Sequence, residues 1–382
     1  MLFKSYKIVP TALIFTIVFS LGTYVYNDIP LRTAIFRTVA KGNNYLISEK
    51  DTLYSFGYYG VRKWLTDSIG NMMLIAENDE FCKNRFIGRL MGRSGTIKGD
   101  YIYVVARSYL GGADEIEAND YLNGKIIVMH KKNLTVVQEI NSDIKLIEAK
   151  IHKNNLVVSG LKGFDVYDIT DASHIKPLYR YRHKKFTEFQ GFEIFEHRDS
   201  TYIAFARFAE GVSIWNMTDR RNVYPVKNIS IQSIYSENEK LPKGLQSFRV
   251  CLKFPYLYAT LAPMSSYFGK VNDRRGIITF DLSNLDSIRN NVTLIPQEEY
   301  YTTKTGDCQP THLDIYNNKL YVNFGEKGYI VFDLTNPFKP KMENIKNINN
   351  KHNVILPIHI NHRGIMFSGN YYWSDLYKNP LN

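Results

Sequence analysis

Two histidines and an aspartate in the C-terminal part of the chain have the clearest capacity for chemistry. His312, Asp314 and His359 are side chains that bind divalent metals, and such groups also transfer protons near neutral pH. No HExxH, GxSxG, phosphate-binding loop or dinucleotide-binding motif occurs in the chain. The three residues therefore form a metal or acid–base site only if the fold brings them together. The alternative is that they are polar groups in contact with water.

A second set of candidates is acidic. Asp114, Glu115, Glu117 and Asp120 fall within seven residues, and hard oxygen ligands at close spacing can hold calcium or another divalent cation. Their order does not match the EF-hand pattern D-x-[DN]-x-[DN]-G. A solvated acidic loop is the other interpretation, so the sequence leaves the question of a cofactor open.

A third set mixes aromatic and basic side chains in the stretch PMSSYFGKVNDRRG. It comprises Tyr267, Phe268, Lys270, Arg274 and Arg275. This mixture suits an anionic or carbohydrate partner. Exposed loop residues of this kind are common, so a solvated surface explains them as well.

The net charge of +11 raises the question of an anionic partner for the whole chain. Lys and Arg are interleaved with acidic residues, and the longest basic runs are as short as Arg182–Lys185. This pattern favours a solvated basic surface, and no nucleic-acid partner is expected. Cys82, Cys251 and Cys308 are widely spaced without a CxxC motif, which excludes a disulfide framework and a thiolate zinc site but leaves one disulfide possible.

Short strands are the elements that must position these residues. From residue 31 onward, apolar runs alternate with turn residues, and no stretch keeps a 3.6-residue apolar period over three turns. One unit recurs along the chain: a glycine, an apolar strand, an aromatic residue at the fourth following position and Asp at the fifth. Gly163, Gly276 and Gly328 begin full copies of this unit, Gly211 begins one with Asn216 in place of Asp, and Gly60 and Gly124 begin degenerate copies.

The repeated unit predicts the architecture. Two strands joined by a tight turn precede each glycine and a fourth strand follows each Asp, so a unit carries four antiparallel strands in roughly 40 residues, as a propeller blade does. Six complete units, and one shared between the C-terminal strands and an orphan strand at Thr33–Val39, predict an all-β, seven-bladed β-propeller. Pairing of the N- and C-terminal strands would close the ring without a long open edge.

The repeated residues have a structural interpretation. Each glycine allows a tight entry into the third strand, where a side chain would clash. Asp168, Asp281 and Asp333 begin the turn to the fourth strand, where a carboxylate can accept hydrogen bonds from backbone N–H groups. We therefore do not expect these aspartates to be ligands or catalysts.

The unit G-x-x-[VI]-[FYW]-D-[ILM]-[TS]-[ND], with Pro near the next strand, resembles the LVIVD-repeat propellers of bacterial exported and surface proteins. The resemblance covers most of residues 31–382 and is best in the units that begin at Gly163, Gly276 and Gly328. It implies a propeller scaffold and brings no catalytic motif.

One face of such a propeller carries the connections from second to third strands and those between blades. We call it the loop-rich face, because the long insertions Ser108–Asn123, Gln232–Gln246, Pro263–Arg275 and Pro296–Pro310 are all of these two kinds. Binding is expected there, since functional residues often lie on loops held by a rigid frame. The innermost strands begin at this face and surround a central channel. The polar residues that the alignment of the units places around its mouth are Glu148, Glu193, Arg249, His312, Asp314 and His359, with Lys150 and Cys251 at equivalent positions.

Residues 1–30 do not fit the repeat. Lys4 and Lys7 precede Ile8–Tyr26, nineteen residues without a charge, which is long enough to span a bilayer with the N-terminus inside. An uncleaved signal-anchor is favoured, and a cleaved signal peptide with the apolar core Ile8–Phe19 is the main alternative. We therefore expect a single propeller domain at residues 31–382 on the extracytoplasmic side of a membrane, in the periplasm or at the cell surface, or secreted after cleavage.

Two functions follow from these patterns. The favoured one is a non-enzymatic binding or scaffold module, tethered by residues 8–26, that engages a protein or glycan partner through the loop-rich face. The alternative is a hydrolase or lyase with a metal or acid–base site in the central channel near His312, Asp314 and His359.

Overall fold

The computed structural model describes most of the chain from Gly42 onward. The described residues are 42–82, 90–108, 124–184, 187–234, 245–263, 274–299, 310–325, 327–346, 355–370, 376–379 and 381. Residues 42–382 form one compact unit.

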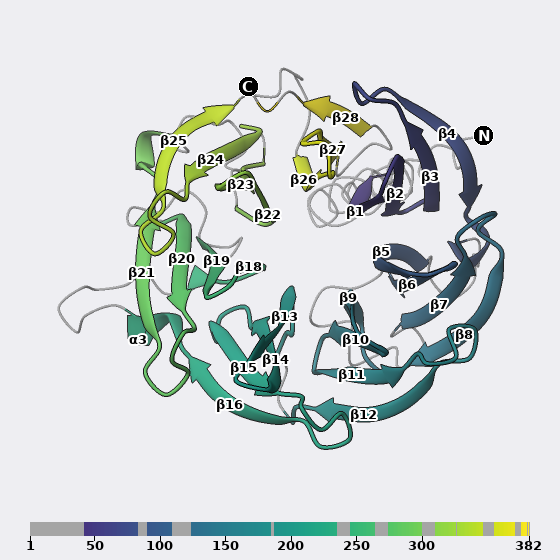
Figure 1. Cartoon of the computed structure of the whole chain (residues 1–382), viewed down its shortest axis with the longest axis horizontal. Coiled ribbons are helices and arrows are strands. Elements are labelled where there is room, and N and C mark those ends of the chain that lie inside the picture. The colour runs from purple at the N-terminus through teal and green to yellow at the C-terminus, as the bar shows by residue number, and fades with distance from the viewer. Residues whose placement is uncertain are drawn as a thin grey trace, which may run out of the picture. The chain divides into compact units, whose positions relative to one another are not determined.

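Seven antiparallel sheets stand in a ring around a central axis, so residues 42–382 form the expected seven-bladed β-propeller (Figure 1). The strands of blades 1 to 4 are β1 (Asn43–Glu49), β2 (Thr52–Gly57), β3 (Gly60–Thr66) and β4 (Met72–Asn78); β5 (Leu90–Lys98), β6 (Tyr101–Ser108), β7 (Gly124–His130) and β8 (Val136–Ser142); β9 (Leu146–His152), β10 (Asn155–Gly160), β11 (Gly163–Asp168) and β12 (Lys176–Arg182); β13 (Phe192–His197), β14 (Ser200–Ala206), β15 (Val212–Asn216) and β16 (Tyr224–Ile229). The strands of blades 5 to 7 are β17 (Leu245–Gln246), β18 (Val250–Lys253), β19 (Tyr256–Pro263), β20 (Gly276–Asp281) and β21 (Arg289–Leu294); β22 (Leu313–Tyr316), β23 (Lys319–Asn323), β24 (Tyr329–Asp333) and β25 (Lys341–Lys346); β26 (Ile355–Ile360), β27 (Met366–Asn370) and β28 (Leu376–Asn379).

Within each blade the strands pair in chain order from the axis outward, and in blade 5 both β17 and β18 pair with β19. Every residue of β10 and of β15 is buried, including the polar residues Ser159 and Asn216. The outermost strand β12, with the sequence KPLYRYR, is only partly buried. Middle strands are mostly apolar because neighbouring blades cover both of their faces, as in other sheets that are buried on two sides.

The core is divided among the junctions between blades. The described residues form seven hydrophobic clusters, and each cluster combines side chains of two adjacent blades. The cluster that joins the last blade to the first contains Phe367 together with Leu46 and Leu53. Packing of apolar side chains therefore closes the ring between blades 7 and 1.

The repeated glycines have the role that the sequence indicates. A Cβ atom at Gly163 would lie 1.9 Å from the carbonyl oxygen of Tyr181, and one at Gly276 would lie 2.2 Å from that of Thr293. Both oxygens belong to the fourth strand of the same blade. The close approach of the third and fourth strands at this point therefore excludes any side chain.

The repeated aspartates begin turns, as expected. Oδ1 of Asp168 accepts hydrogen bonds from the backbone N and Oγ1 of Thr170, at 2.8 and 2.6 Å. These bonds lower the pKa of Asp168, because they favour the charged carboxylate. Asp281 and Asp333 accept the same backbone bond from the residue two positions later, each at 3.1 Å. Their carboxylates are occupied by local structure.

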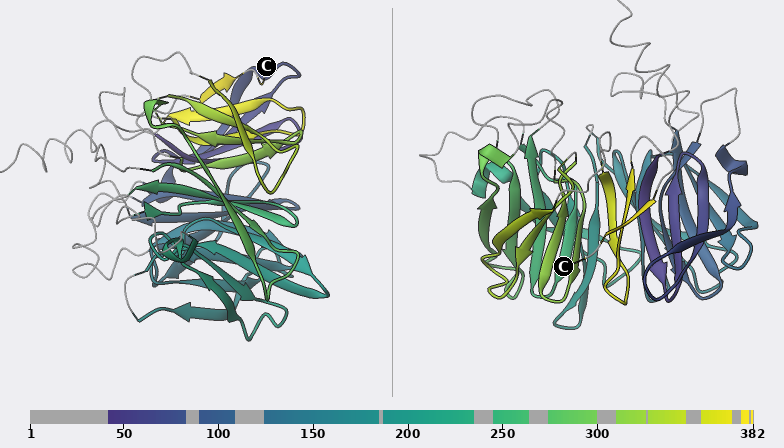
Figure 2. Two further views of the ribbon diagram at one scale, coloured as in Figure 1. Left: turned by 90° about the vertical axis from the view of Figure 1, so that its left-hand side faces the viewer. Right: turned by 90° about the horizontal axis from the view of Figure 1, so that it is seen from above.

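The two faces of the ring differ in their connections, and Figure 2 shows the ring from the side. Turns from first to second strands are short, and Lys50–Asp51, Lys153–Asn154 and Asn317–Asn318 contain two residues each. We call this the short-turn face. The strand ends that border all four long insertions lie on the opposite edge, because antiparallel order places them there. The strand ends that border the four insertions therefore share one face of the ring, as expected for the loop-rich face.

Blade 7 differs from the others in its described part, which has the three strands β26, β27 and β28. Thr33–Val39, the segment expected to add its fourth strand, lies outside the described residues, so closure by strand pairing stays a prediction. The apolar segment at residues 8–26 also lies outside them. The helices that the structure does describe, α3 (Ile231–Ile234), η1 (Glu80–Cys82) and η5 (Gln297–Glu299), are all too short to cross a bilayer.

Replacing Gly163 by alanine should destabilise the propeller. The new methyl group would collide with the Tyr181 carbonyl, and overpacking of this kind costs about 1–3 kcal/mol. Chemical denaturation of the Gly163→Ala variant measures the loss. Gly99→Asn is the matched control, because Gly99 has open space around it and a positive φ of 56° that asparagine tolerates. Equal stability of the two variants would contradict the steric role.

Candidate functional site

Charged side chains and one tyrosine meet at the axis of the ring, on or next to the innermost strands. We call Tyr45, Glu148, Lys150, Glu193 and Arg249 the axial cluster. Oε2 of Glu148 and NH1 of Arg249 form an ion pair, and these side chains are only 3% and 7% exposed. Glu148 belongs to blade 3 and Arg249 precedes β18 of blade 5, so the pair passes across blade 4.

Glu148 has further partners that fix its carboxylate. The Tyr45 hydroxyl donates to Oε1 at 3.0 Å, and the backbone N of Phe192 donates to Oε2 at 3.2 Å. Burial, and next the charge of Glu148, raise the pKa of Tyr45, so its phenol remains a hydrogen-bond donor. The Arg249 guanidinium lies 5.5 Å from the centre of the Tyr45 ring. One carboxylate therefore connects blades 1, 3, 4 and 5.

The second pair in the axial cluster joins blade 3 to blade 4. Nζ of Lys150 lies 2.7 Å from Oε1 of Glu193 and 3.9 Å from Oε1 of Glu148. Burial by itself would lower the pKa of Lys150, but Glu193 and Glu148 outweigh it and raise that pKa. Burial raises the pKa of Glu193, and Lys150 offsets part of the effect. Two acids and two bases thus balance each other at the axis.

A glycine makes room for the first of these pairs. A Cβ atom at Gly191 would lie 2.4 Å from Cδ of Arg249 and 3.0 Å from Oε2 of Glu148. Gly191 immediately precedes β13, the innermost strand of blade 4. The absence of a side chain there lets the ion pair cross from blade 3 to blade 5.

His312 lies among cations. It is buried just before β22, and burial, followed by the charges of Arg249 and Arg93, holds the pKa of His312 well below its usual range. Its Nδ1 is 3.4 Å from Oγ1 of Thr311, and a hydrogen bond with the backbone of Asn44 offsets part of the lowering of its pKa. The imidazole is therefore neutral at neutral pH, in surroundings that disfavour a metal cation.

Asp314 and His359 do meet, as the sequence suggested. Oδ2 of Asp314 lies 3.5 Å from Nδ1 of His359. The other ring nitrogen of His359, Nε2, is 2.8 Å from Oγ of Ser48 on β1. The structure thus assembles Ser48, His359 and Asp314 from blades 1, 7 and 6.

The structure does not form the metal site considered for His312, Asp314 and His359. Within the described part of the chain, no three His, Cys, Asp or Glu side chains are placed to hold a metal ion. The reason is that His312 packs beside Arg249 and Arg93, whereas Asp314 lies beside His359. Cys251 stays a protonated thiol, because burial, and then Glu193 and Asp314, raise its pKa well above the usual value.

Most of the loop candidates lie outside the described residues. These are Asp114, Glu115, Glu117, Asp120, Tyr267, Phe268 and Lys270. Arg275, expected in an exposed loop, is instead only 1% exposed, and its carbonyl oxygen accepts a hydrogen bond from Ile295 N at 2.8 Å. It belongs to the packed edge of blade 5, because it directly precedes β20.

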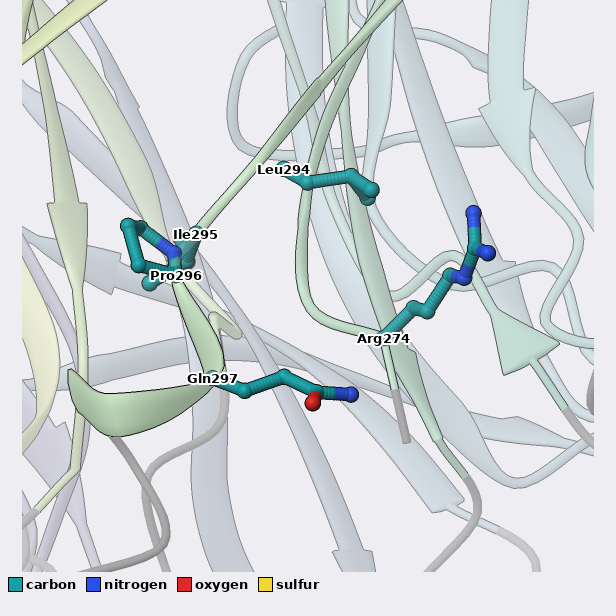
Figure 3. A pocket seen from close by; sticks show the side chains of 5 residues that line it. All are labelled: Arg274, Leu294, Ile295, Pro296 and Gln297. Carbon is teal, nitrogen blue, oxygen red and sulfur yellow. The ribbon is translucent and has the colours of Figure 1, made fainter. Parts of the chain in front are cut away.

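Arg274 lines a pocket on the loop-rich face, where blade 5 connects to blade 6. The pocket has a volume of about 430 Å³ and is lined by Arg274, Leu294, Ile295, Pro296 and Gln297. The close-up in Figure 3 shows Leu294 and Gln297 extending toward the side of the pocket that holds the Arg274 guanidinium. A cation and an amide therefore stand beside an apolar wall.

Sequence reasoning missed Tyr45, Ser48 and Gly191. The first two lie on β1, upstream of the weak repeat that begins at Gly60, where the repeated motif gives no guidance. A usable signal was the two-residue turn Lys50–Asp51, which matches the inner turns of other blades. Alignment on that turn would have placed β1 at the axis.

Neither a family model nor a curated protein sequence matches the chain. Solved structures do match in fold. A chain of the mitotic checkpoint complex is similar with a TM-score of 0.56 and 12% identity, over 87% of this chain and 89% of that one. The periplasmic gluconolactonase PpgL of Pseudomonas aeruginosa is similar with a TM-score of 0.53 and 10% identity, over 89% of each chain.

The extracellular domain of a putative hybrid two-component system from B. thetaiotaomicron is also similar, with a TM-score of 0.52 and 11% identity, over 90% of this chain and 39% of that one. Structural similarity at a sequence identity of 10–12% shows only that the fold is shared. They support a seven-bladed propeller, and the finer resemblance to LVIVD-repeat propellers stays a prediction.

The Glu148–Arg249 pair should show strong energetic coupling. Removing one partner of a buried ion pair leaves an uncompensated charge and costs about 3–5 kcal/mol. We expect Glu148→Gln and Arg249→Met each to lose stability in that range. The double variant should lose clearly less than the sum of the two, as a double-mutant cycle by denaturant titration would measure. Strict additivity would contradict the pairing.

Lys150 should make stability fall in alkali. Because its pKa is higher in the folded state, its contribution is complete below the unfolded-state pKa of about 10.4 and declines as the pH rises from there toward the folded-state pKa. The stability difference between the wild type and Lys150→Met should therefore narrow between about pH 9 and pH 11.5. Lys132→Met, at an exposed lysine, is the control. A constant difference for Lys150→Met would refute the effect.

Proposed function

We propose that this protein is a non-enzymatic binding or scaffold module that engages a protein or glycan partner through the loop-rich face. The observation that carries the proposal is the pocket beside Arg274. It lies between the end of β21 and the connection to blade 6, on the edge that borders all four long insertions. A rigid ring that presents variable connections on one edge is a suitable frame for recognition.

The chemistry of the pocket indicates the kind of group it would take. The Arg274 guanidinium can bind a carboxylate, and the Gln297 amide can both donate and accept hydrogen bonds. Leu294, Ile295 and Pro296 supply an apolar wall for a sugar ring or an aliphatic side chain. An acidic glycan or an acidic peptide segment combines these features.

The same proposal places the propeller outside the cytoplasm. It rests on the charge pattern of the N-terminal segment, in which Lys4 and Lys7 precede the uncharged stretch Ile8–Tyr26. Retention of this stretch would tether the propeller to a membrane, and cleavage would release it. Kinship with LVIVD-repeat propellers would fit both cases, since the repeated units resemble theirs.

A hydrolase or lyase is the second candidate function. The contact of His359 with Asp314 favours it, because an imidazole held by a carboxylate can act as a general base. A periplasmic gluconolactonase shares the fold, at 10% identity. In this second candidate the chemistry would be acid–base chemistry carried by side chains at the axis.

Changing the pocket should weaken partner binding. We expect the double variant Arg274→Ala/Gln297→Ala to lose about tenfold or more in binding to acidic glycans on a microarray, because a hydrogen bond to a charged group contributes about 1.5–3 kcal/mol. The full-length chain is compared at one salt concentration.

Arg221→Ala is the matched control, since Arg221 is exposed in the β15–β16 turn on the short-turn face. It should bind as the wild type does. Equal binding by all three proteins would exclude the pocket as the binding site. If no glycan binds, an acidic peptide is the remaining ligand for the pocket. Binding of a fluorescent acidic peptide to the same three proteins, with polyglutamate as the competitor, then tests that ligand.

A further inference from the structure

Ser48, His359 and Asp314 are arranged in the order nucleophile, base and carboxylate. Oγ of Ser48 is 2.8 Å from Nε2 of His359, and Nδ1 of the same ring is 3.5 Å from Oδ2 of Asp314. A nucleophile within hydrogen-bond reach of a base, with the base oriented by a third group, is the arrangement that activates a serine hydroxyl. The carboxylate contact is longer than a hydrogen bond, which is common in sites without substrate.

Both contacts of the imidazole agree on one tautomer. A proton on Nδ1 faces the Asp314 carboxylate, which can only accept when charged. The lone pair on Nε2 then faces Ser48 and accepts its hydroxyl proton. This is the tautomer in which His359 can take the proton from Ser48 during attack on a carbonyl carbon.

Backbone groups hold the carboxylate in position. Oδ2 of Asp314 accepts a hydrogen bond from Ile360 N, the residue that follows His359, and Oδ1 accepts one from Ile315 N, both at 2.8 Å. The first bond ties the carboxylate to the strand that carries the imidazole. Rotation of Asp314 away from His359 would break both bonds.

Water reaches the three side chains, although they lie on innermost strands. The side chains of His359 and Asp314 are 22% and 26% exposed, and Ser48 is partly exposed. Ser48 stands one residue before the end of β1, and His359 one residue before the end of β26. Asp314 stands two residues before the end of β22. The trio therefore lies nearer the short-turn face than the channel mouth on the loop-rich face, where the alignment of the units placed Asp314 and His359, because all three residues stand within two residues of the ends of their strands.

Neighbouring charges restrict what could react there. The carboxylate of Asp314 is itself part of the trio. Glu193 lies close enough that both charges raise the pKa of the same thiol, that of Cys251. Lys150, 2.7 Å from Glu193, offsets part of this negative charge. A negatively charged substrate would be repelled by these carboxylates, whereas a neutral one would not.

We propose that Ser48, His359 and Asp314 form an acyl-transfer site that hydrolyses small, uncharged carboxylic esters. This activity is independent of partner binding at the loop-rich face. Ser48 Oγ forms a bond to the ester carbonyl carbon while His359 Nε2 takes its proton. The bond to the leaving oxygen then breaks, and the alcohol leaves with that proton. Water, activated by His359, attacks the acyl–serine ester and releases the carboxylic acid and free Ser48. Asp314 is a positioning residue.

Covalent labelling of the full-length chain tests the nucleophile. A fluorophosphonate probe should form one adduct, which peptide mass spectrometry locates at Ser48. The folded Ser48→Ala variant should give no adduct. It should hydrolyse p-nitrophenyl acetate more slowly than the Ser94→Ala variant does. Ser94 is the matched control, because it also lies on an innermost strand, and its Oγ accepts a hydrogen bond from the backbone N of Ala149 instead of contacting a histidine.

Variants of the base and the carboxylate test the mechanism. His359→Ala should slow labelling about 10²-fold or more, and added imidazole should restore part of the rate. Asp314→Asn should lower kcat by at least tenfold and change KM little, since it acts through the imidazole. Thermal unfolding confirms that each variant is folded.

Labelling of the wild type needs no variant to be decisive. An adduct at another residue, or no adduct at all, would overturn the proposal. So would equal ester hydrolysis by Ser48→Ala and Ser94→Ala. Loss of glycan or peptide binding in the Arg274 variants would leave these results untouched, so the two proposals fail separately.

Discussion

Packing between neighbouring blades is the interaction on which this structure depends. Among the described residues, each cluster of buried apolar side chains is shared by two blades, because the middle strands of a blade bury side chains on both faces. A fully buried aliphatic or aromatic side chain contributes about 1.5–3 kcal/mol. That contribution exists only once the next blade is in place. The ring must therefore close, and Phe367 of blade 7 reaches Leu46 and Leu53 of blade 1 to close it.

Closure brings seven innermost strands around one axis, and polar side chains occupy it. The ion pair of Glu148 and Arg249 crosses a whole blade, and Tyr45 reaches Glu148 from blade 1. Burying such charges contributes little net stability, because desolvation offsets the attraction. Their effect is on geometry, since each pair is satisfied only when the blades that carry its members have the observed spacing and register. The same spacing and register of the blades place Ser48 beside His359.

The sequence predicted which strands carry the candidate residues better than it predicted which side chains those residues contact. Alignment of the repeats assigned Glu148, Arg249 and Asp314 to the innermost strands, and in the structure Glu148 lies on β9, Asp314 on β22 and Arg249 directly before β18. It could not show that His312 would lie beside Arg249 and Arg93, because those contacts cross the ring between residues far apart in sequence. Arg275 was expected at the surface, yet it is buried, since the start of β20 packs closely against the end of β21. Charge alone does not determine exposure at the end of a strand.

The sequence by itself determined the all-β character, the number of blades and the roles of repeated residues such as Gly163 and Asp168. These features arise from contacts within one unit of roughly 40 residues, so a repeated pattern is enough to reveal them. Only the tertiary structure decided which side chains meet at the axis. Ser48, Asp314 and His359 come from the first, sixth and seventh blades. They become neighbours because the ring closes, and no local pattern in the sequence encodes that contact.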